Sequence, residues 1–262
     1  MTSFLNRTLN VVIPAGASGI GRSIAEAFIN ENCTVFICDI SKKFIRSFQK
    51  DYPGVSVDRV DVSNHADVEL FFKSISLKTD RIDVLINCAG IAGPTDLLQN
   101  ITVKDWDNTV STNLNGMFYV LKEAIPLLKK SSSPSIINIA SSASFFGFPF
   151  RSPYAAAKWA VIGLTKTLAM ELGGDGFRIN AVCPGSVSGN RINSVLKLDA
   201  KKQKKSVGEI KDLYTKQTSM KTFVEPEDVA HLVLFLSSDY GRFISGQAIG
   251  IDGHTEGLST KI

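Results

Sequence analysis

The chain has 262 residues, of which 44% are hydrophobic and 21% are charged. This composition excludes a disordered, collagen-like or coiled-coil protein, and the length allows one large α/β domain or two small ones. No apolar run approaches the roughly 18 residues that a membrane span needs, and Met1–Asn10 lacks the apolar centre of a signal peptide. We therefore expect a cytoplasmic protein with no membrane partner.

The net charge of +4, from 29 Lys and Arg against 25 Asp and Glu, is too small to indicate a nucleic-acid partner. Its most visible local source is a run of lysines: Lys197, Lys201, Lys202, Lys204, Lys205 and Lys211. These form either a solvated helix face or mobile loop, or a basic flap over an anionic substrate. Four cysteines without C-x-x-C spacing are expected to be free thiols, mostly buried.

Short apolar runs alternate with helix-length amphipathic stretches along the chain. The runs are rich in Val and Ile and mostly lack polar alternation, which is typical of strands covered on both faces. The predicted strands are Leu9–Ile13, Thr34–Cys38, Val55–Val60, Val84–Ile86, Ser135–Ile139, Ile179–Cys183 and Ala248–Ile251. The predicted helices are Ile20–Asn30, Lys42–Lys50, Ala66–Leu77, Lys104–Leu128, Tyr154–Leu172 and Asp228–Leu236.

Helix start signals agree with this pattern at Asn64, Thr102 and Glu225-Pro226. Alternating strands and helices predict the α/β class, as a Rossmann-like doubly wound parallel sheet in three α/β/α layers. Because no linker or repeat divides the chain, we expect a single domain over residues 1–262.

A glycine-rich turn joins the first predicted strand to the first helix, over Pro14–Arg22. Such a turn lets backbone N–H groups reach a pyrophosphate at a helix N-terminus, although a tight turn without a ligand is the alternative. The second strand ends at Asp39, whose carboxylate would accept hydrogen bonds from a ribose diol and repel a 2′-phosphate. No Arg or Lys lies between Ala15 and Gly21, so NAD is favoured over NADP. The alternative for Asp39 is a capping or solvated carboxylate.

Polar residues also follow the third and fourth strands, as Asp61-Val62 and Asn87-Cys88-Ala89-Gly90. These positions are the carboxyl ends of strands, where open α/β sheets bind ligands. Asp61 could accept a hydrogen bond from an adenine amino group, or it could simply cap the next helix.

The fifth strand leads to Ser141-Ser142, and Tyr154 and Lys158 follow on one helix face. A phenol has an ordinary pKa of about 10, so it needs a nearby cation to act as an acid or base near neutral pH. A lysine ammonium and an oxidised nicotinamide would both supply positive charge. Tyr154 could then exchange a proton with a secondary alcohol as hydride moves to or from the nicotinamide.

Together these motifs resemble the short-chain dehydrogenases/reductases, in their compact branch. The resemblance rests on Ala15–Gly21, Asp61-Val62, Asn87-x-Ala89-Gly90, Asn113, Ser141, Tyr154-x-x-x-Lys158 and Pro184-Gly185. It implies that Tyr154 is the general acid/base, that Lys158 lowers its pKa and holds the nicotinamide ribose, and that Ser141 orients the substrate oxygen, with Ser142 as the alternative serine. It also implies that Asn113 lies in a kinked helix and anchors a proton-relay water.

By the same resemblance, the expected cofactor-binding residues are Gly16, Ser18, Gly19, Ile20, Asp39, Asp61, Val62, Asn87, Ala89, Gly90, Tyr154, Lys158, Pro184, Gly185 and Val187. Residues 186–222 would form a mobile flap over the substrate. The resemblance further implies a homotetramer or homodimer, packed through Lys104–Leu128 and Tyr154–Leu172. No cluster of His, Cys and carboxylates has metal-ligand spacing, so no metal is expected.

Three positions depart from the family pattern. The usual Thr-Gly that opens the glycine motif is Pro14-Ala15, so either Gly16 takes over the turn or Ala15 fits with a negative φ. Cys88 replaces an asparagine, and Gly189 stands where a threonine often bonds the nicotinamide carboxamide, with Ser188 as a possible substitute.

These residues predict an NAD-dependent oxidoreductase that interconverts a secondary alcohol and a ketone. Arg151 and Arg191 near the expected pocket favour a carboxylated or otherwise polar substrate, such as a sugar, polyol or sugar acid, whereas the apolar loop Phe145–Phe150 argues for an apolar wall. A 3-oxoacyl-thioester reductase is an alternative, but it would normally prefer NADP. A non-catalytic dinucleotide sensor is the third reading, supported only by Pro14-Ala15.

Overall fold

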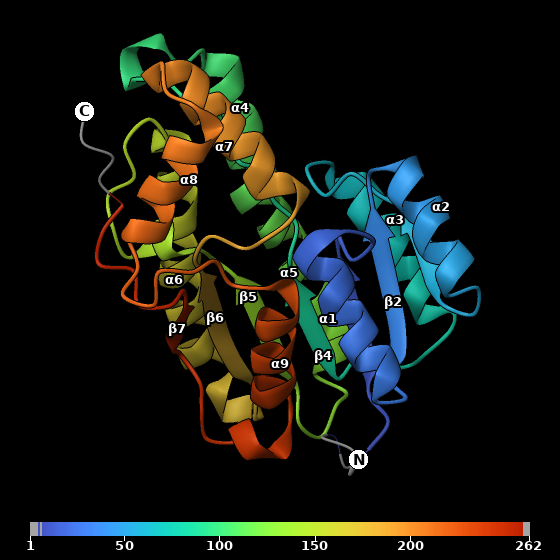
Figure 1. The fold of residues 1–262 in the computed structure, drawn as a ribbon. Coiled ribbons are helices and arrows are strands. Elements are labelled where there is room, and N and C mark those ends of the chain that lie inside the picture. Colours follow the sequence, from blue (N-terminus) through green and yellow to red (C-terminus); the bar gives the residue numbers. More distant parts are fainter. Residues whose placement is uncertain (1–4, 6, 259–262) are drawn as a thin grey trace.

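A computed structural model describes residues 5 and 7–258 of the chain (Figure 1); part of the Met1–Asn10 segment thus lies outside the described residues. Seven parallel strands form one sheet in the order β3-β2-β1-β4-β5-β6-β7. The strands are β1 (Asn10–Pro14), β2 (Thr34–Asp39), β3 (Ser56–Arg59), β4 (Val84–Asn87), β5 (Ser135–Ile139), β6 (Arg178–Pro184) and β7 (Ala248–Ile251). All seven predicted strands are present, and the predicted Rossmann-like α/β fold is confirmed.

The order of the strands reverses beside β1, which pairs with β2 on one side and with β4 on the other. In a doubly wound sheet this reversal opens a crevice at the carboxyl ends of the strands, where ligands bind. The central strands are buried on both faces, and every residue of β4 and β5 is buried. This explains why their sequences are continuous apolar runs.

Helices cover both faces of the sheet. One face carries α1 (Gly19–Asn30), α2 (Lys42–Asp51) and α9 (Pro226–Ser237), and α1 packs closely against α9 (Figure 1). The opposite face carries α3 (His65–Ser76), α5 (Gly116–Leu128) and α6 (Ser152–Leu172). Each face buries its own apolar cluster against the strands, which gives the predicted three layers.

The helix starts match the capping signals in the sequence. The side chain of Asn64 accepts a hydrogen bond from the backbone of α3, and Thr102 does the same for α4 (Val103–Val110). Glu225 forms a reciprocal capping box with Asp228 at the start of α9, where Pro226 occupies the first turn. These local bonds fix where the helices begin at the edges of the sheet.

The predicted helix Lys104–Leu128 is not continuous. It consists of α4, a π-helical turn over Ser111–Asn115, and α5. A π-turn accommodates an extra residue in one helical turn and is frequent at functional sites. Here it turns Asn113 completely into the interior. The family resemblance implied a kinked helix at Asn113, and a π-helical turn interrupts the helix there; the prediction of one uninterrupted helix was wrong.

Residues 186–222 are largely helical. They contain α7 (Asn190–Gln203) and α8 (Val207–Lys216), which pack on each other around Leu196, Ala200, Ile210 and Tyr214. In Figure 1, α7 and α8 lie above β6 and β7. The six clustered lysines are exposed: Lys197, Lys201 and Lys202 lie on α7, Lys211 lies on α8, and Lys204 and Lys205 lie in the connection between the two helices. Within residues 5 and 7–258, no helix combines the length and apolarity that crossing a membrane requires.

Candidate active site

The tyrosine and lysine of the predicted catalytic set lie one turn apart near the start of α6. The Lys158 ammonium lies 5.8 Å from the centre of the Tyr154 ring. The Ser141 hydroxyl, just beyond β5, is hydrogen-bonded to the Tyr154 phenol and also accepts a bond from the backbone N–H of Ala143, at 3.2 Å. Ser141, rather than Ser142, is thus the serine that contacts the phenol.

The electrostatic surroundings favour an ionised phenol. Burial opposes ionisation of Tyr154, but the charge of Lys158, followed by Arg191, the Ser141 hydrogen bond and Arg151, outweighs it and lowers the pKa of the phenol. Burial also lowers the pKa of Lys158, against the opposing effect of Tyr154. The pair therefore exchanges protons closer to neutrality than either group would alone in water.

Asn113 and Lys158 hold the backbone around this pair. The Asn113 side chain clamps Ile91, accepting from its N–H at 2.7 Å and donating to its carbonyl at 2.9 Å. The Lys158 ammonium donates to the carbonyl of Ile139 at 2.8 Å. A Cβ at Gly90 would lie 3.0 Å from Asn113 Oδ1 and 3.7 Å from Lys158 Nζ. A larger residue at position 90 would therefore need the Asn113 side chain to shift by a few tenths of an ångström.

The glycine-rich turn differs from the prediction at its first residue. Ala15 has φ +58°, in the left-handed region, so the expectation that it fits with a negative φ was wrong. Two glycines of the turn allow close packing: a Cβ at Gly16 would lie 2.6 Å from Ile37 Cγ2, and one at Gly21 would lie 2.2 Å from the Ala15 carbonyl. Ala15 keeps this strained conformation because the close packing at Gly16 and Gly21 holds the rest of the turn in place.

The start of α1 fits a dinucleotide phosphate. Ser18 is the N-cap residue, and its side chain bonds none of the first-turn N–H groups. A Cβ at Gly19 would meet no atom within 4 Å, so the helix opens onto free space there. Ile20 follows in the first turn. A helix N-terminus with open N–H groups is a favourable site for an anion.

Asp39 ends β2 beside this turn and is almost fully buried. Burial raises the pKa of its carboxyl group, against the opposing effect of backbone hydrogen bonds from Ser41, Ala17 and Ile40. The N-cap of α2 is Ser41, not Asp39, which argues against the capping alternative. Arg22, the cation that directly follows Gly21 of the glycine-rich turn, forms ion pairs with Glu26 and Asp51, both at 2.7 Å.

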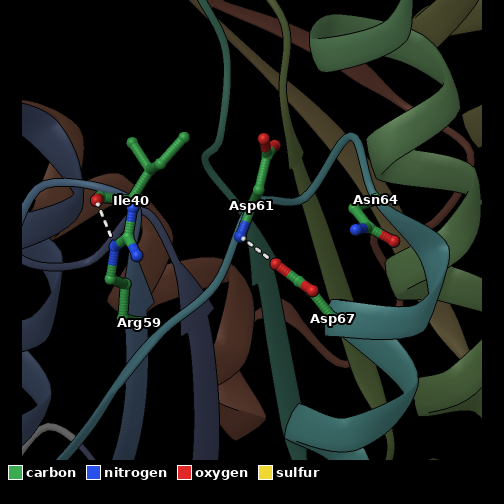
Figure 2. A pocket seen from close by; sticks show the side chains of 5 residues that line it. All are labelled: Ile40, Arg59, Asp61, Asn64 and Asp67. Atoms are coloured by element: carbon green, nitrogen blue, oxygen red, sulfur yellow. Dashed lines mark hydrogen bonds between the residues drawn. The ribbon is translucent and has the colours of Figure 1, made fainter.

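A hollow of about 240 Å³ lies at the carboxyl end of β3 (Figure 2). Its lining residues are Ile40, Arg59, Asp61, Asn64 and Asp67. Asp61 Oδ1 accepts from the N–H and hydroxyl of Ser63, while the Asp61 N–H donates to Asp67. Arg59 Nε donates to the carbonyl of Ile40 at 3.3 Å. No signal in the sequence pointed to Arg59, because an arginine at the end of an edge strand is usually a solvated side chain.

The remaining predicted cofactor residues lie along the same edge of the sheet. Val62 is buried beneath it, and Ala89 is half-buried just beyond β4. The Asn87 side chain donates to Asn138 Oδ1 at 2.8 Å, which ties β4 to β5, and its own Oδ1 is buried without a protein partner. Asn87 therefore has one oxygen left for a ligand or water.

The chain leaves the sheet after Pro184, the last residue of β6. The N–H of Gly185 donates to the carbonyl of Ile251 at 3.1 Å. A Cβ at Gly185 would lie 2.7 Å from the Cβ of Asp252, so a larger residue would separate the two strand ends. Val187 then pairs with Val224, which brings the two ends of residues 186–222 together.

Comparison with known proteins agrees with this arrangement. A family described as enoyl-(acyl carrier protein) reductase matches residues 15–255. The 3-oxoacyl-(acyl-carrier-protein) reductase of Thermotoga maritima is 36% identical over 246 residues, covering 92% of this chain and 95% of that protein. The chain is a short-chain dehydrogenase/reductase.

Other members of the family are similar over the same length. The meso-2,3-butanediol dehydrogenase of Serratia marcescens is 33% identical over 245 residues, covering 93% of this chain and 92% of that protein. The solved structure of the aldohexose dehydrogenase of Thermoplasma acidophilum has a TM-score of 0.84 at 30% identity, covering 98% and 96% of the two chains. This short-chain dehydrogenase/reductase is therefore an enzyme that acts on CH–OH groups with a nicotinamide dinucleotide.

One expectation about this short-chain dehydrogenase/reductase was wrong. Arg151 does not face the substrate as a free cation: it is 2% exposed and is paired with Asp199 on α7 at 3.0 Å. The sequence contained an indirect signal. Arg151 lies between the apolar run Phe145–Phe150 and Pro153, and a charged side chain among apolar residues needs a partner of opposite charge. Nothing in the sequence identified Asp199 as that partner.

The cysteines of this short-chain dehydrogenase/reductase are free, with Cys38 and Cys183 buried and Cys33 and Cys88 half-buried. Burial raises the pKa of Cys88 to about 11 and that of Cys183 to about 12, so both stay protonated near neutrality. Among the described residues, no group of three His, Cys, Asp or Glu side chains could hold a metal ion.

Proposed function

We propose that the protein is an NAD-dependent oxidoreductase that interconverts a secondary alcohol and a ketone by hydride transfer. The observation that carries this proposal is the lowered pKa of the Tyr154 phenol, beside the Lys158 charge and the Ser141 hydroxyl. A half-buried phenol with these neighbours is suited to general acid/base catalysis near neutral pH. Replacing Tyr154 with phenylalanine should abolish turnover, while the dinucleotide still binds through the other cofactor-binding residues.

In the oxidative direction, the substrate hydroxyl lies against Tyr154 and Ser141, and its proton passes to the phenolate. A bound nicotinamide would supply the acceptor for the hydride of the carbinol carbon. Lys158 stabilises the phenolate electrostatically and would also hold the nicotinamide ribose. Asn113 keeps the backbone at Ile91 in place and would anchor the water through which the proton leaves. Ketone reduction runs the same proton transfer in reverse.

The choice of NAD rests on Asp39. Its buried carboxylate lies where a ribose diol would donate hydrogen bonds, and a 2′-phosphate there would meet a negative charge. Arg22, which could have offset this repulsion, is already paired. Asp39→Ala should therefore reduce the preference for NAD over NADP. A wild-type enzyme with lower KM for NADP than for NAD would contradict this part of the proposal.

For the substrate, we favour a neutral sugar or polyol. The pairing of Arg151 with Asp199 removes one of the two cations that favoured a sugar acid, and Arg191 alone remains. Two relatives are named for a diol and for aldohexoses, respectively. The test is NADH formation with a panel of polyols, aldoses and sugar acids. A higher kcat/KM for sugar acids than for their neutral counterparts would restore the sugar-acid hypothesis.

A 3-oxoacyl-thioester reductase is the second candidate, because the Thermotoga maritima relative carries that name. It shares the catalytic residues, so the two candidates differ in substrate and cofactor. Acetoacetyl thioesters with NADPH and NADH distinguish them. Rapid thioester reduction with NADPH, together with no oxidation of polyols, would favour this candidate.

We further propose that residues 186–222 form the substrate flap within a single catalytic domain, and that the enzyme is a homodimer or homotetramer. Two large apolar side chains on the helices expected at the interface, Phe118 on α5 and Trp159 on α6, are each 52% exposed. Burying such side chains against a second copy is favourable. Sedimentation equilibrium would test this, since a monomer at micromolar concentration would contradict it.

A further inference from the structure

Three polar side chains meet in the interior where the flap lies against the catalytic helix. Arg151 Nη2 donates to Asp199 Oδ1 at 3.0 Å, and the Tyr214 hydroxyl donates to Asp199 Oδ2. Their exposed fractions are 2%, 6% and 4%, respectively. Burial and the Asp199 charge raise the pKa of Tyr214 well above its ordinary range, so its hydroxyl remains a donor.

Each of these side chains comes from a different element. Arg151 is the N-cap residue of α6, three positions before Tyr154, while Asp199 lies on α7 and Tyr214 on α8. The cluster thus joins both flap helices to the start of the catalytic helix. A second, half-exposed connection runs from Lys202 on α7 to Asp96, at 2.6 Å, and the Asp96 N–H donates to the carbonyl of Phe150.

The cluster has the properties of a functional rather than a stabilising feature. Burying an ion pair rarely stabilises a fold more than apolar residues of the same volume would. Arg151 Nη1 is buried without a protein partner, and Phe150, directly before it, has φ +65°. Strain and unpaired polar groups of this kind concentrate at functional sites.

We propose that Arg151, Asp199 and Tyr214 form a latch that fastens the closed flap to the catalytic helix, with Arg151 acting as a positioning residue for Tyr154. This inference rests on the proposed function. When the flap is closed, the latch holds the Arg151 cation near the reacting phenol, with Asp199 as the ion-pair partner of Arg151. When the flap lifts, Asp199 and Tyr214 move away with α7 and α8, and Arg151 is left without its partners.

If the cluster is a latch of this kind, charge changes in it should shift the pH dependence of kcat/KM, which a purely structural contact would not do. Arg151 is among the groups that lower the pKa of Tyr154, and Asp199 offsets part of its charge. Asp199→Asn leaves Arg151 uncompensated, so the midpoint at which kcat/KM rises with pH should fall. Arg151→Met leaves the negative charge of Asp199, so the same midpoint should rise. We expect shifts of about half a pH unit in opposite directions, and a midpoint near the wild-type value in the double variant.

Tyr214→Phe is the control for charge, because it removes one hydroxyl of the latch and changes no charge. The midpoint should stay at its wild-type value, while KM rises about threefold to tenfold with little change in kcat. Trypsin should also cleave faster after the exposed lysines of the flap, between positions 197 and 211, in this variant without any substrate present. This proteolysis assay reports on the latch even if no substrate is found, so it separates failure of the latch from failure of the proposed function.

Shifts of the midpoint in the same direction for Asp199→Asn and Arg151→Met would overturn the proposal, as would unchanged proteolysis in Tyr214→Phe. Loss of activity on anionic substrates alone in Arg151→Met would also overturn it, because that result means direct contact with substrate. If Arg151→Met does not fold, Asp199→Asn still decides: a midpoint that falls supports the latch, and one that stays or rises contradicts it.

Discussion

Replacing Ala15 with glycine should stabilise the protein, although it removes a methyl group. Ala15 has φ +58°, and a residue with a Cβ pays about 1–2 kcal/mol in that region. Glycine avoids this cost but adds about 0.4–1 kcal/mol of conformational entropy to the unfolded chain. The net gain in the free energy of unfolding is at most about 1.6 kcal/mol, and about 0.8 kcal/mol from the middle of each range. For a chain of this size that corresponds to a rise in Tm of about 1–4 °C.

Ala17→Gly is the matched control, because it makes the same exchange two residues later in the same turn. Ala17 is 1% exposed and is not among the residues with positive φ, so it should lose about 1 kcal/mol or more through lost burial and added chain entropy. Differential scanning calorimetry and urea unfolding measure both variants. A lower Tm for Ala15→Gly than for the wild type would refute the reasoning about strain in this turn.

Three further predictions concern the cofactor site, the acid/base and the core. Gly16→Ala should cost about 1–3 kcal/mol of stability and weaken NAD binding, seen by NADH fluorescence titration, because its Cβ would lie 2.6 Å from Ile37 Cγ2. In alcohol oxidation, kcat/KM should rise with pH through a midpoint below the ordinary phenol value of about 10, because the pKa of Tyr154 is lowered, and Lys158→Met should move that midpoint upward in a pH–rate profile. Arg178→Met should lower the stability to urea by about 2–4 kcal/mol without changing NAD affinity, because the buried guanidinium bonds three backbone carbonyls at the end of α9.

The strands and most helices were predictable because their signals are local. Buried parallel strands leave continuous apolar runs, and residues such as Asn64 and Thr102 mark helix starts by bonding the backbone beside them. The π-helical turn at Asn113 was not predictable from periodicity, because both flanking helices are amphipathic and the extra residue shifts the pattern only slightly. Only the resemblance to the family indicated a kink there.

The site residues also divide into those with a local signal in the sequence and those without one. Ser141, Tyr154 and Lys158 could be placed together from spacing on a strand end and one helix face. The latch could not, because Arg151, Asp199 and Tyr214 are brought together by tertiary packing, and their separations in sequence carry no periodic signal. Asp199 is the one acidic residue of α7 and it is buried, but the exposed lysines beside it in the sequence favoured a solvent-exposed position.

The central claim is that Tyr154 is the acid/base of an NAD-linked alcohol–ketone interconversion. The most direct measurement compares wild type and Tyr154→Phe for NADH formation across the polyol and aldose panel, with NADH affinity measured by fluorescence in both. The account predicts turnover of at least one substrate by the wild type, its loss in the variant, and NADH binding that persists in the variant. Turnover by Tyr154→Phe at the wild-type rate would contradict it.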